Sequence, residues 1–201
     1  MKKALLINGA KVFTSSLGVG GGKLNATLQS VAKEHLESNG YQVIETIIDD
    51  GYNKHEEVEK WLSSDLVIWQ FPAWWMGEPY IVKEYIDKVF ITGVGRFYKN
   101  DGRSRENPKA NYGTGGLLKG KKVMFSMTWN APLEAFSGVS NQKDSAFFEG
   151  HDIEVLILHL RKAHEYIGMT ALKTFMCNDV VKDPQVSRYI EDYKKHLEAV
   201  I

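Results

Sequence analysis

The chain alternates short apolar runs with longer segments whose apolar residues recur at helical spacing. Five runs of strand length are rich in apolar or β-branched residues, and they occupy 4–8, 42–48, 65–71, 122–128 and 171–177. The first, third and fourth runs are almost continuously apolar, which is typical of strands covered on both faces. The pattern therefore predicts a sheet whose central strands are buried.

Four further segments follow the helical period. The first has apolar residues at i, i+4, i+7 and i+8 from Leu24, and Gly40 supplies a C-terminal glycine. A second helix is predicted over 54–63, a third from Pro79, and a last one after Asp183 and Pro184, which read as a cap and a helix start. The segment 153–169 keeps helical register, but its first half fits a strand equally well.

This alternation of strands and helices predicts one domain over 1–201, an α/β fold built on a doubly wound, five-stranded parallel sheet with helices on both faces. Two segments, 93–120 and 130–152, fit no element. They are either solvated surface loops or functional, mobile ones.

Ligands of such sheets bind beyond the carboxyl ends of the strands, so the loops that follow the strands are the candidate site. The loop after the first strand contains Thr14, Ser15 and Ser16, four glycines and Lys23, and it runs into the first helix near Asn25. Free backbone N–H groups at a helix start bind anions, which predicts a phosphate cradle. The alternative is a flexible glycine-rich loop that binds nothing.

The cradle is neither of the two common nucleotide motifs. A Walker A loop needs Ser or Thr after the lysine, where Leu24 stands, and a glycine where Leu17 stands. The dinucleotide fingerprint through Gly18 and Gly20 needs a third glycine where Lys23 stands. A different phosphate-bearing ligand is therefore predicted.

Tryptophans follow two other strands. Trp74 and Trp75 cannot both point into the core, and Trp129 precedes Asn130. Aromatic walls beside a phosphate cradle fit a planar ring on a phosphate tail, which indicates a flavin nucleotide.

Composition narrows the class of partner. The 25 basic residues equal the 25 acidic ones, so no net charge attracts nucleic acid or an anionic membrane. No apolar stretch approaches the roughly 18 residues of a membrane span, and the opening run is too short for a signal peptide. We therefore expect a cytoplasmic protein acting on small molecules, with no nucleic acid partner and no integral membrane segment.

Other chemistry-bearing residues add little. No histidine cluster has metal-ligand spacing, so no metal is predicted. His164 lies on an apolar helical stripe and is expected in the core, His151 and His159 could reach the site, and Cys177 is expected to be buried and inert.

The sequence resembles the flavodoxin-like NAD(P)H:quinone oxidoreductases, and within them the modulator of drug activity B group. The resemblance covers nearly the whole chain and rests on INGAK.F at 7–13, LN.TL at 24–28, VIWQFP.WWMG.P at 67–79, YGTGGL at 112–117, GKK at 120–122, TWNAP.EAF at 128–136, GM at 168–169 and NDV at 178–180. It implies a flavodoxin-like fold, bound FAD, a homodimer with the site at the subunit interface, and two-electron reduction of quinones by NADPH.

The resemblance also implies roles for residues at the strand ends. Ser16, Gly22, Lys23, Leu24 and Asn25 would hold the pyrophosphate and adenosine side of FAD. The remaining cofactor-binding residues would surround the isoalloxazine ring: Pro72, Ala73, Trp74 and Trp75 on one side, Thr128, Trp129, Asn130 and Ala131 on another, and Tyr112 from the long loop. The segment from Leu17 to Gly22 is longer than the usual first loop of the family.

The implied cycle is ping-pong, with hydride passing from NADPH to the flavin and then to the quinone. Tyr112 is the candidate for orienting the quinone, and backbone amides around Trp129 and Asn130 are expected to favour negative charge on the reduced ring. Azo or nitroaromatic reduction is the near alternative. A flavodoxin-type electron carrier and a regulatory module with a vestigial flavin are others. A phospho-acceptor domain needs acidic residues at the ends of the first and third strands, where this chain has Asn8, Gly9, Phe71 and Pro72.

Overall fold

A parallel sheet forms the centre of the structure, a computed structural model that describes residues 1–11, 22–137 and 147–201. Its strands are β1 (Lys3–Asn8), β2 (Gln42–Ile47), β3 (Leu66–Pro72), β4 (Lys122–Thr128), β5 (Thr170–Ala171) and β6 (Phe175–Cys177). The order is β2-β1-β3-β4-β5, with β6 also on β4, and every pairing is parallel. This is the flavodoxin-like order, and it confirms the predicted fold class.

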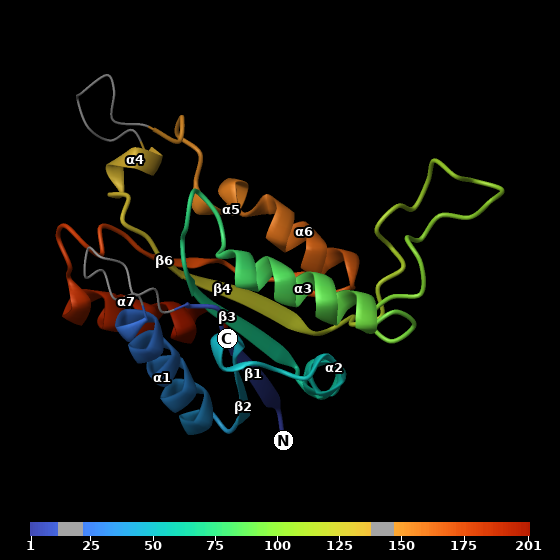
Figure 1. Cartoon of the computed structure of the whole chain (residues 1–201), viewed down its shortest axis with the longest axis horizontal. Helices are drawn as coiled ribbons and strands as arrows, with labels where there is room; N and C mark the ends of the chain where they lie inside the picture. The colour runs from blue at the N-terminus through green and yellow to red at the C-terminus, as the bar shows by residue number, and fades with distance from the viewer. Residues whose placement is uncertain (12–21, 138–146) are drawn as a thin grey trace.

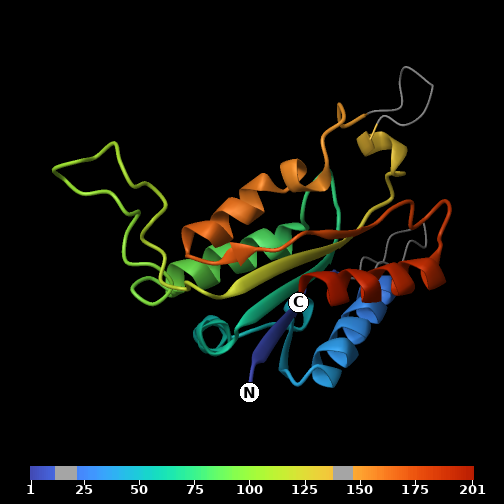
Figure 2. The same cartoon turned by 180° about the vertical axis from the view of Figure 1, so that it is seen from behind.

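Helices cover both faces of the sheet (Figures 1 and 2). On one face lie α1 (Lys23–Ser38) and α7 (Val186–Val200); on the other lie α2 (Lys54–Ser63), α3 (Tyr80–Thr92), α5 (Ile153–Leu156) and α6 (Leu158–Tyr166). The short helices η1 (Ile48–Asp50) and α4 (Glu134–Ser137) lie in loops. As predicted, β1, β3 and β4 are buried almost throughout, because each face has its own apolar cluster.

The end of the first helix follows the prediction. Gly40 has φ of 79°, and the Tyr41 amide donates to the Leu36 carbonyl at 3.0 Å. Such a left-handed glycine lets the chain close the last helical turn and leave toward β2.

Two predicted details are wrong. The strand expected over 171–177 is split, because one extra residue bulges between its halves: three residues, 172–174, face two on β4. The bulged Thr174 amide donates instead to Glu154 Oε1 at 2.7 Å. The last helix starts at Val186 with Gln185 at the N-cap and no side-chain cap, so Asp183 is not its cap.

The segment 153–169, whose first half fitted a strand as well as a helix, is helical. It forms α5 and α6, which join at Ile157, where the backbone leaves helical geometry (φ −103°, ψ 23°). Ile153, Ile157, Leu160 and His164 are buried, so the helical period determined the outcome.

The predicted loop 93–120 projects away from the sheet, at the end opposite α4 (Figure 1). The C-terminal part of the loop packs closely against the backbone at Gly168. A Cβ on Gly116 would lie only 2.3 Å from the Gly168 amide nitrogen, so only glycine fits there. The Leu118 amide also donates to the Ile167 carbonyl at 2.9 Å. The base of the loop is thereby tied to the end of α6, next to the start of β4.

Candidate functional site

The start of α1 offers backbone donors at the carboxyl edge of the sheet. Gly22 is the N-cap residue, with φ of 130° and no side-chain cap. The first helical bond runs from the Ala26 amide to the Gly22 carbonyl, so the amides of Lys23, Leu24 and Asn25 have no acceptor among the described residues. Such an end binds anions well. The predicted contacts from Thr14, Ser15 and Ser16 lie outside the described residues.

Asn25 is buried and its side chain points back into the fold. Gln70 Nε2 donates to Asn25 Oδ1 at 2.8 Å, and Asn25 Nδ2 donates to Thr128 Oγ1 at 3.2 Å. These bonds tie α1 to the ends of β3 and β4. The buried side chains of Asn25 and Thr128 therefore join α1 to the sheet, and the Asn25 backbone amide is the group left for the predicted ligand contact.

The loop after β3 forms a tight reverse turn. The Trp74 amide donates to the Gly77 carbonyl at 2.8 Å, and the Gly77 amide donates back at 3.1 Å. Ala73 donates its amide to the Thr128 carbonyl at 2.8 Å, while Pro72, Ala73 and Trp74 are half-buried. Trp75 is 97% exposed, so at least one of the two tryptophans does leave the core, as predicted.

The loop after β4 differs from the prediction in one respect. Trp129 is buried against Phe136 and Phe148, with ring centroids 5.3 and 5.5 Å away, and its amide donates to the Cys177 carbonyl. Neither its ring nor its amide is available to a ligand. Asn130 is exposed, and the amides of Asn130 and Ala131 have no hydrogen-bond acceptor among the described residues.

A pocket of about 430 Å³ opens beside this loop, between Pro132, the residues after β6 and the start of α7. Asn178, Asp179 and Arg188 line it, and Asp179 Oδ1 is buried with no hydrogen-bond partner in the described segments. A buried acceptor at a pocket wall suits a ligand N–H or O–H. Asn178 and Asp179 follow the strand predicted over 171–177, so the rule that ligands bind beyond the strand ends also points to this pocket when it is applied to that strand.

Tyr112 does not join these residues within one chain. It lies in the loop 93–120, 5.9 Å from the Tyr166 ring, with the Arg103 guanidinium 5.5 Å from its own ring centroid. That loop returns to the start of β4, whereas Asn130 follows its end. Seven strand residues rise by about 20 Å, so one copy of the chain cannot bring Tyr112 to the other loops.

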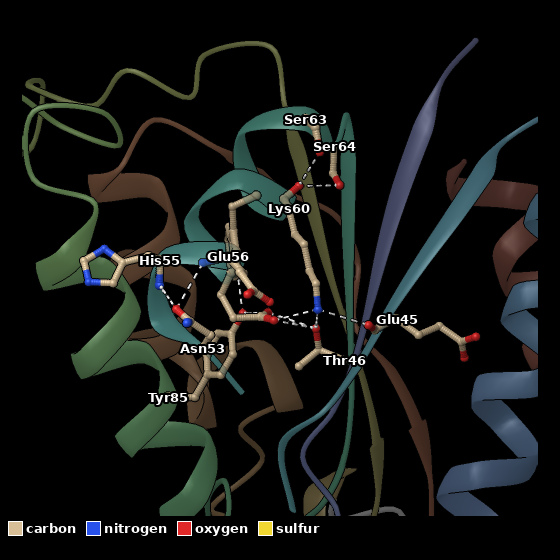
Figure 3. A network of polar contacts seen from close by, with 11 residues as sticks. Glu45, Thr46, Asn53, His55, Glu56, Lys60, Ser63, Ser64 and Tyr85 are labelled. Carbon is tan, nitrogen blue, oxygen red and sulfur yellow. Dashed lines mark hydrogen bonds and ion pairs between the residues drawn. The ribbon is translucent and has the colours of Figure 1, made fainter. Parts of the chain in front are cut away.

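A second buried polar cluster lies on the opposite face of the sheet, between α2, α3 and β2 (Figure 3). Glu57 is 1% exposed and accepts hydrogen bonds from Tyr85, Thr46 and Lys60. The Trp61 indole donates to the Tyr85 hydroxyl at 2.9 Å. Burial, with the Glu57 carboxylate as a second cause, raises the pKa of Tyr85 well above its ordinary value. All these groups are satisfied, so the cluster is structural.

His164 and Cys177 are core residues, as predicted. The His164 ring donates from Nδ1 to the Leu160 carbonyl at 2.7 Å and accepts at Nε2 from the Trp69 indole at 3.0 Å. Burial lowers the pKa of His164 to about 4 and raises the pKa of the Cys177 thiol to about 12. His164 is therefore neutral, and Cys177 is a thiol.

His159 is the histidine that reaches the candidate site, since its Nε2 lies 2.8 Å from Glu78 Oε2 in the loop after β3. Sequence alone does not predict this pair, because its members are 81 residues apart. Within 1–11, 22–137 and 147–201, no group of three His, Cys, Asp or Glu residues is arranged to hold a metal, and no helix there is long and apolar enough to cross a membrane.

Comparisons with known proteins agree with this fold. A family model described as a flavodoxin-like fold matches residues 2–200. The chain is 52% identical to NADPH:quinone oxidoreductase MdaB of Haemophilus influenzae, over 98% of this chain and 97% of that protein.

Solved structures share the fold. A candidate quinone reductase from Klebsiella pneumoniae has a TM-score of 0.76 at 22% identity, over 99% of this chain and 85% of that one. General stress protein 14 of Treponema denticola, solved in complex with FMN, has a TM-score of 0.67 at 18% identity, over 99% of each chain.

Proposed function

The chain belongs to the flavodoxin-like family that contains NADPH:quinone oxidoreductase MdaB, and we propose that it transfers two electrons from NADPH to quinones on a bound FAD. The observation that carries the proposal is that three features of the described residues meet at the carboxyl ends of the strands. They are the start of α1, which has no side-chain cap among these residues, the exposed turn at Trp75, and the amides of Asn130 and Ala131, which have no acceptor among them. The 52% identity over nearly the full length supports the substrate class.

The described residues fit a flavin nucleotide. The amides of Lys23, Leu24 and Asn25, which have no acceptor in the described part of the chain, would bind its phosphates together with Gly22. Ser16 lies outside the described residues and is proposed for the same role from the sequence. Pro72, Ala73, Trp74 and Trp75 would border the ring on one side and Asn130 and Ala131 on the other. Thr128 contributes through the main-chain bond from Ala73, which fixes the spacing of the two loops. When bound there, a flavin would supply hydride transfer from NADPH to the quinone in two separate half-reactions, a ping-pong sequence.

The pocket beside Asp179 favours FAD over FMN within this proposal. FMN ends at its phosphate, whereas FAD carries an adenosine that needs its own space. A pocket of about 430 Å³ is within the range of small-ligand sites, and it lies at the same sheet edge. The unpartnered Asp179 Oδ1 would accept a hydrogen bond from the adenosine, and Arg188 would cover its ring.

Tyr112 enters the proposal only through a second copy of the chain. Because it lies at the far end of the sheet from Asn130, its role in orienting the quinone requires a homodimer that brings the 93–120 loop of one subunit to the site of the other. We expect Tyr112→Phe to keep its flavin and its dimeric mass while the KM for menadione rises. Light scattering and steady-state kinetics test this, and unchanged kinetics remove Tyr112 from the role.

The experiment that tests the function begins with the visible spectrum of the purified protein. Flavin released by heat is identified by chromatography, and the bound flavin is then reduced anaerobically with NADPH before menadione is added. FAD that bleaches with NADPH and is reoxidised by menadione supports the proposal. FMN would contradict the adenosine pocket, and a protein that refuses flavin would contradict the whole assignment.

Reduction of azo or nitroaromatic compounds is the second candidate. It is favoured by the exposure of Trp75 at an open edge, which accepts planar molecules of different kinds. The ratio of kcat/KM for menadione to that for an azo dye decides between the two.

A further inference from the structure

The turn after β3 adopts a backbone conformation that its residues disfavour. Trp75 and Met76 have φ of 46° and 70°, so both central residues of a two-residue reverse turn are left-handed. This geometry normally requires Asn or Gly, because a side chain with a Cβ crowds the following carbonyl in the left-handed region. Something in the surrounding structure must hold the turn in this shape.

The strain is not offset by burial of the turn's tip. Trp75 is 97% and Met76 50% exposed, so two large apolar side chains stand in solvent at the edge where the ligand is proposed. Strain together with exposure is typical of a segment shaped for a ligand rather than for the core.

Glu78, the residue after the turn, connects the turn to helix α6. Its side chain is 9% exposed and lies 2.8 Å from His159 Nε2 on α6. A carboxylate so nearly buried is costly without a partner, so the contact with His159 fixes where Glu78 lies. Since Glu78 directly follows Gly77, which closes the turn, fixing Glu78 also fixes the turn.

We propose that Glu78 and His159 are a positioning pair, which holds the Trp75–Met76 turn in its strained shape so that it forms one wall of the quinone-binding site. The inference rests on the proposed function. Neither residue takes part in the chemistry; their effect reaches the substrate through the orientation of Trp75 and Met76.

The test uses the flavin-loaded protein and three variants. His159→Leu removes the partner of Glu78, and His159→Gln restores a donor of similar reach. Lys162→Gln is the matched control, because it breaks an exposed ion pair with Glu165 on the same helix without touching the loop.

Hydrogen exchange of peptides covering 72–79 is the readout that does not depend on activity. We expect the amides of Trp74 and Gly77 to exchange about tenfold faster in His159→Leu and at the wild-type rate in the other two variants. In kinetics, the KM for menadione should rise about five- to tenfold in His159→Leu, with kcat and flavin content unchanged.

Two results overturn the inference: wild-type exchange in His159→Leu, or faster exchange without any change in the KM for menadione. Failure of the proposed function is separate, since it shows as a wild-type protein that binds no flavin. In that case the exchange rates alone still decide whether the pair holds the turn.

Discussion

The two faces of the sheet carry buried polar networks that differ in how completely they are hydrogen-bonded. Between α2, α3 and β2, Glu57 accepts hydrogen bonds from three side chains, and the Trp61 indole donates a hydrogen bond to the Tyr85 hydroxyl. Under the start of α1, Asn25 joins Gln70 to Thr128, but Gln70 Oε1 and Gln29 Oε1 are buried with no partner among the described residues.

This difference separates a structural network from a ligand-supporting one. The first network is closed, so it contributes to stability and offers nothing to a ligand. The second is open beside the candidate phosphate site, and each unpaired buried acceptor costs about 1–3 kcal/mol unless a donor arrives. Hydroxyl groups of a bound flavin nucleotide are suitable donors. Stability and binding should therefore respond differently to changes on the two faces.

The largest effect is expected from opening the closed network. Glu57→Ala leaves Tyr85, Thr46 and Lys60 without their common acceptor inside the core, and breaking a buried charged pair costs about 3–5 kcal/mol. Urea unfolding should show this loss, while the affinity of the folded protein for FAD is unchanged. The control is Glu59→Ala on the same helix, which loses only an exposed pair with Arg96 and should unfold like the wild type.

The next effect is a pH dependence of the free energy of unfolding, caused by His164 on the same face of the sheet as the Glu57 network. Because the pKa of His164 is lowered from 6.5 to about 4, the unfolded chain binds a proton that the folded chain refuses between these values. Stability should thus fall as the pH drops from 6.5 to 4, by about 3 kcal/mol from this group. Urea unfolding across this range measures it, and a His164→Leu variant that keeps the full slope would contradict it.

A smaller effect on stability, with a clear effect on binding, is expected from the open network. Asn25→Ala removes the link from α1 to Gln70 and Thr128, at a cost of about 1–3 kcal/mol. We expect FAD to bind about tenfold more weakly, by fluorescence titration, because the helix start is no longer fixed. Thr27→Ala, which loses only a bond to the Lys23 carbonyl within α1, should bind FAD normally.

The smallest effect is the reactivity of Cys177, which lies in the apolar cluster of α1 and α7. With the pKa of its thiol raised to about 12, labelling by iodoacetamide should occur only through local opening. FAD should slow labelling further if it closes the open network. Rapid labelling of the folded protein would show that this face is more dynamic than its burial indicates.

The periodicity of the sequence was sufficient for the fold, since the predicted strands and helices are found, apart from the split of the strand over 171–177 and the start of the last helix. Side-chain direction at the strand ends was not predictable in the same way. Thr128 and Trp129 are neighbours, yet alternation sends Thr128 to Asn25 on one face and Trp129 to Phe136 on the other. The strand-end rule selects this loop as a candidate, but it does not tell which residues of the loop pack into the core.

Contacts between segments far apart in the chain could not be predicted from the sequence either. Nothing in the residues around Glu78 indicates His159, and the position of Tyr112 followed only from the closure of its loop on Gly168. The bulge in the last strand depends on Glu154, which lies 20 residues earlier and takes the Thr174 amide.

That bulge determines how two copies of the chain can associate. At the β5–β6 edge the Thr174 amide is taken by Glu154, and the Lys173 carbonyl lies 2.9 Å from His196 Nε2. The bulge interrupts this edge and both of these backbone groups are hydrogen-bonded within the chain, a device that prevents sheets from joining edge to edge. A continuous sheet across two copies of the chain is therefore not favoured at the β5–β6 edge.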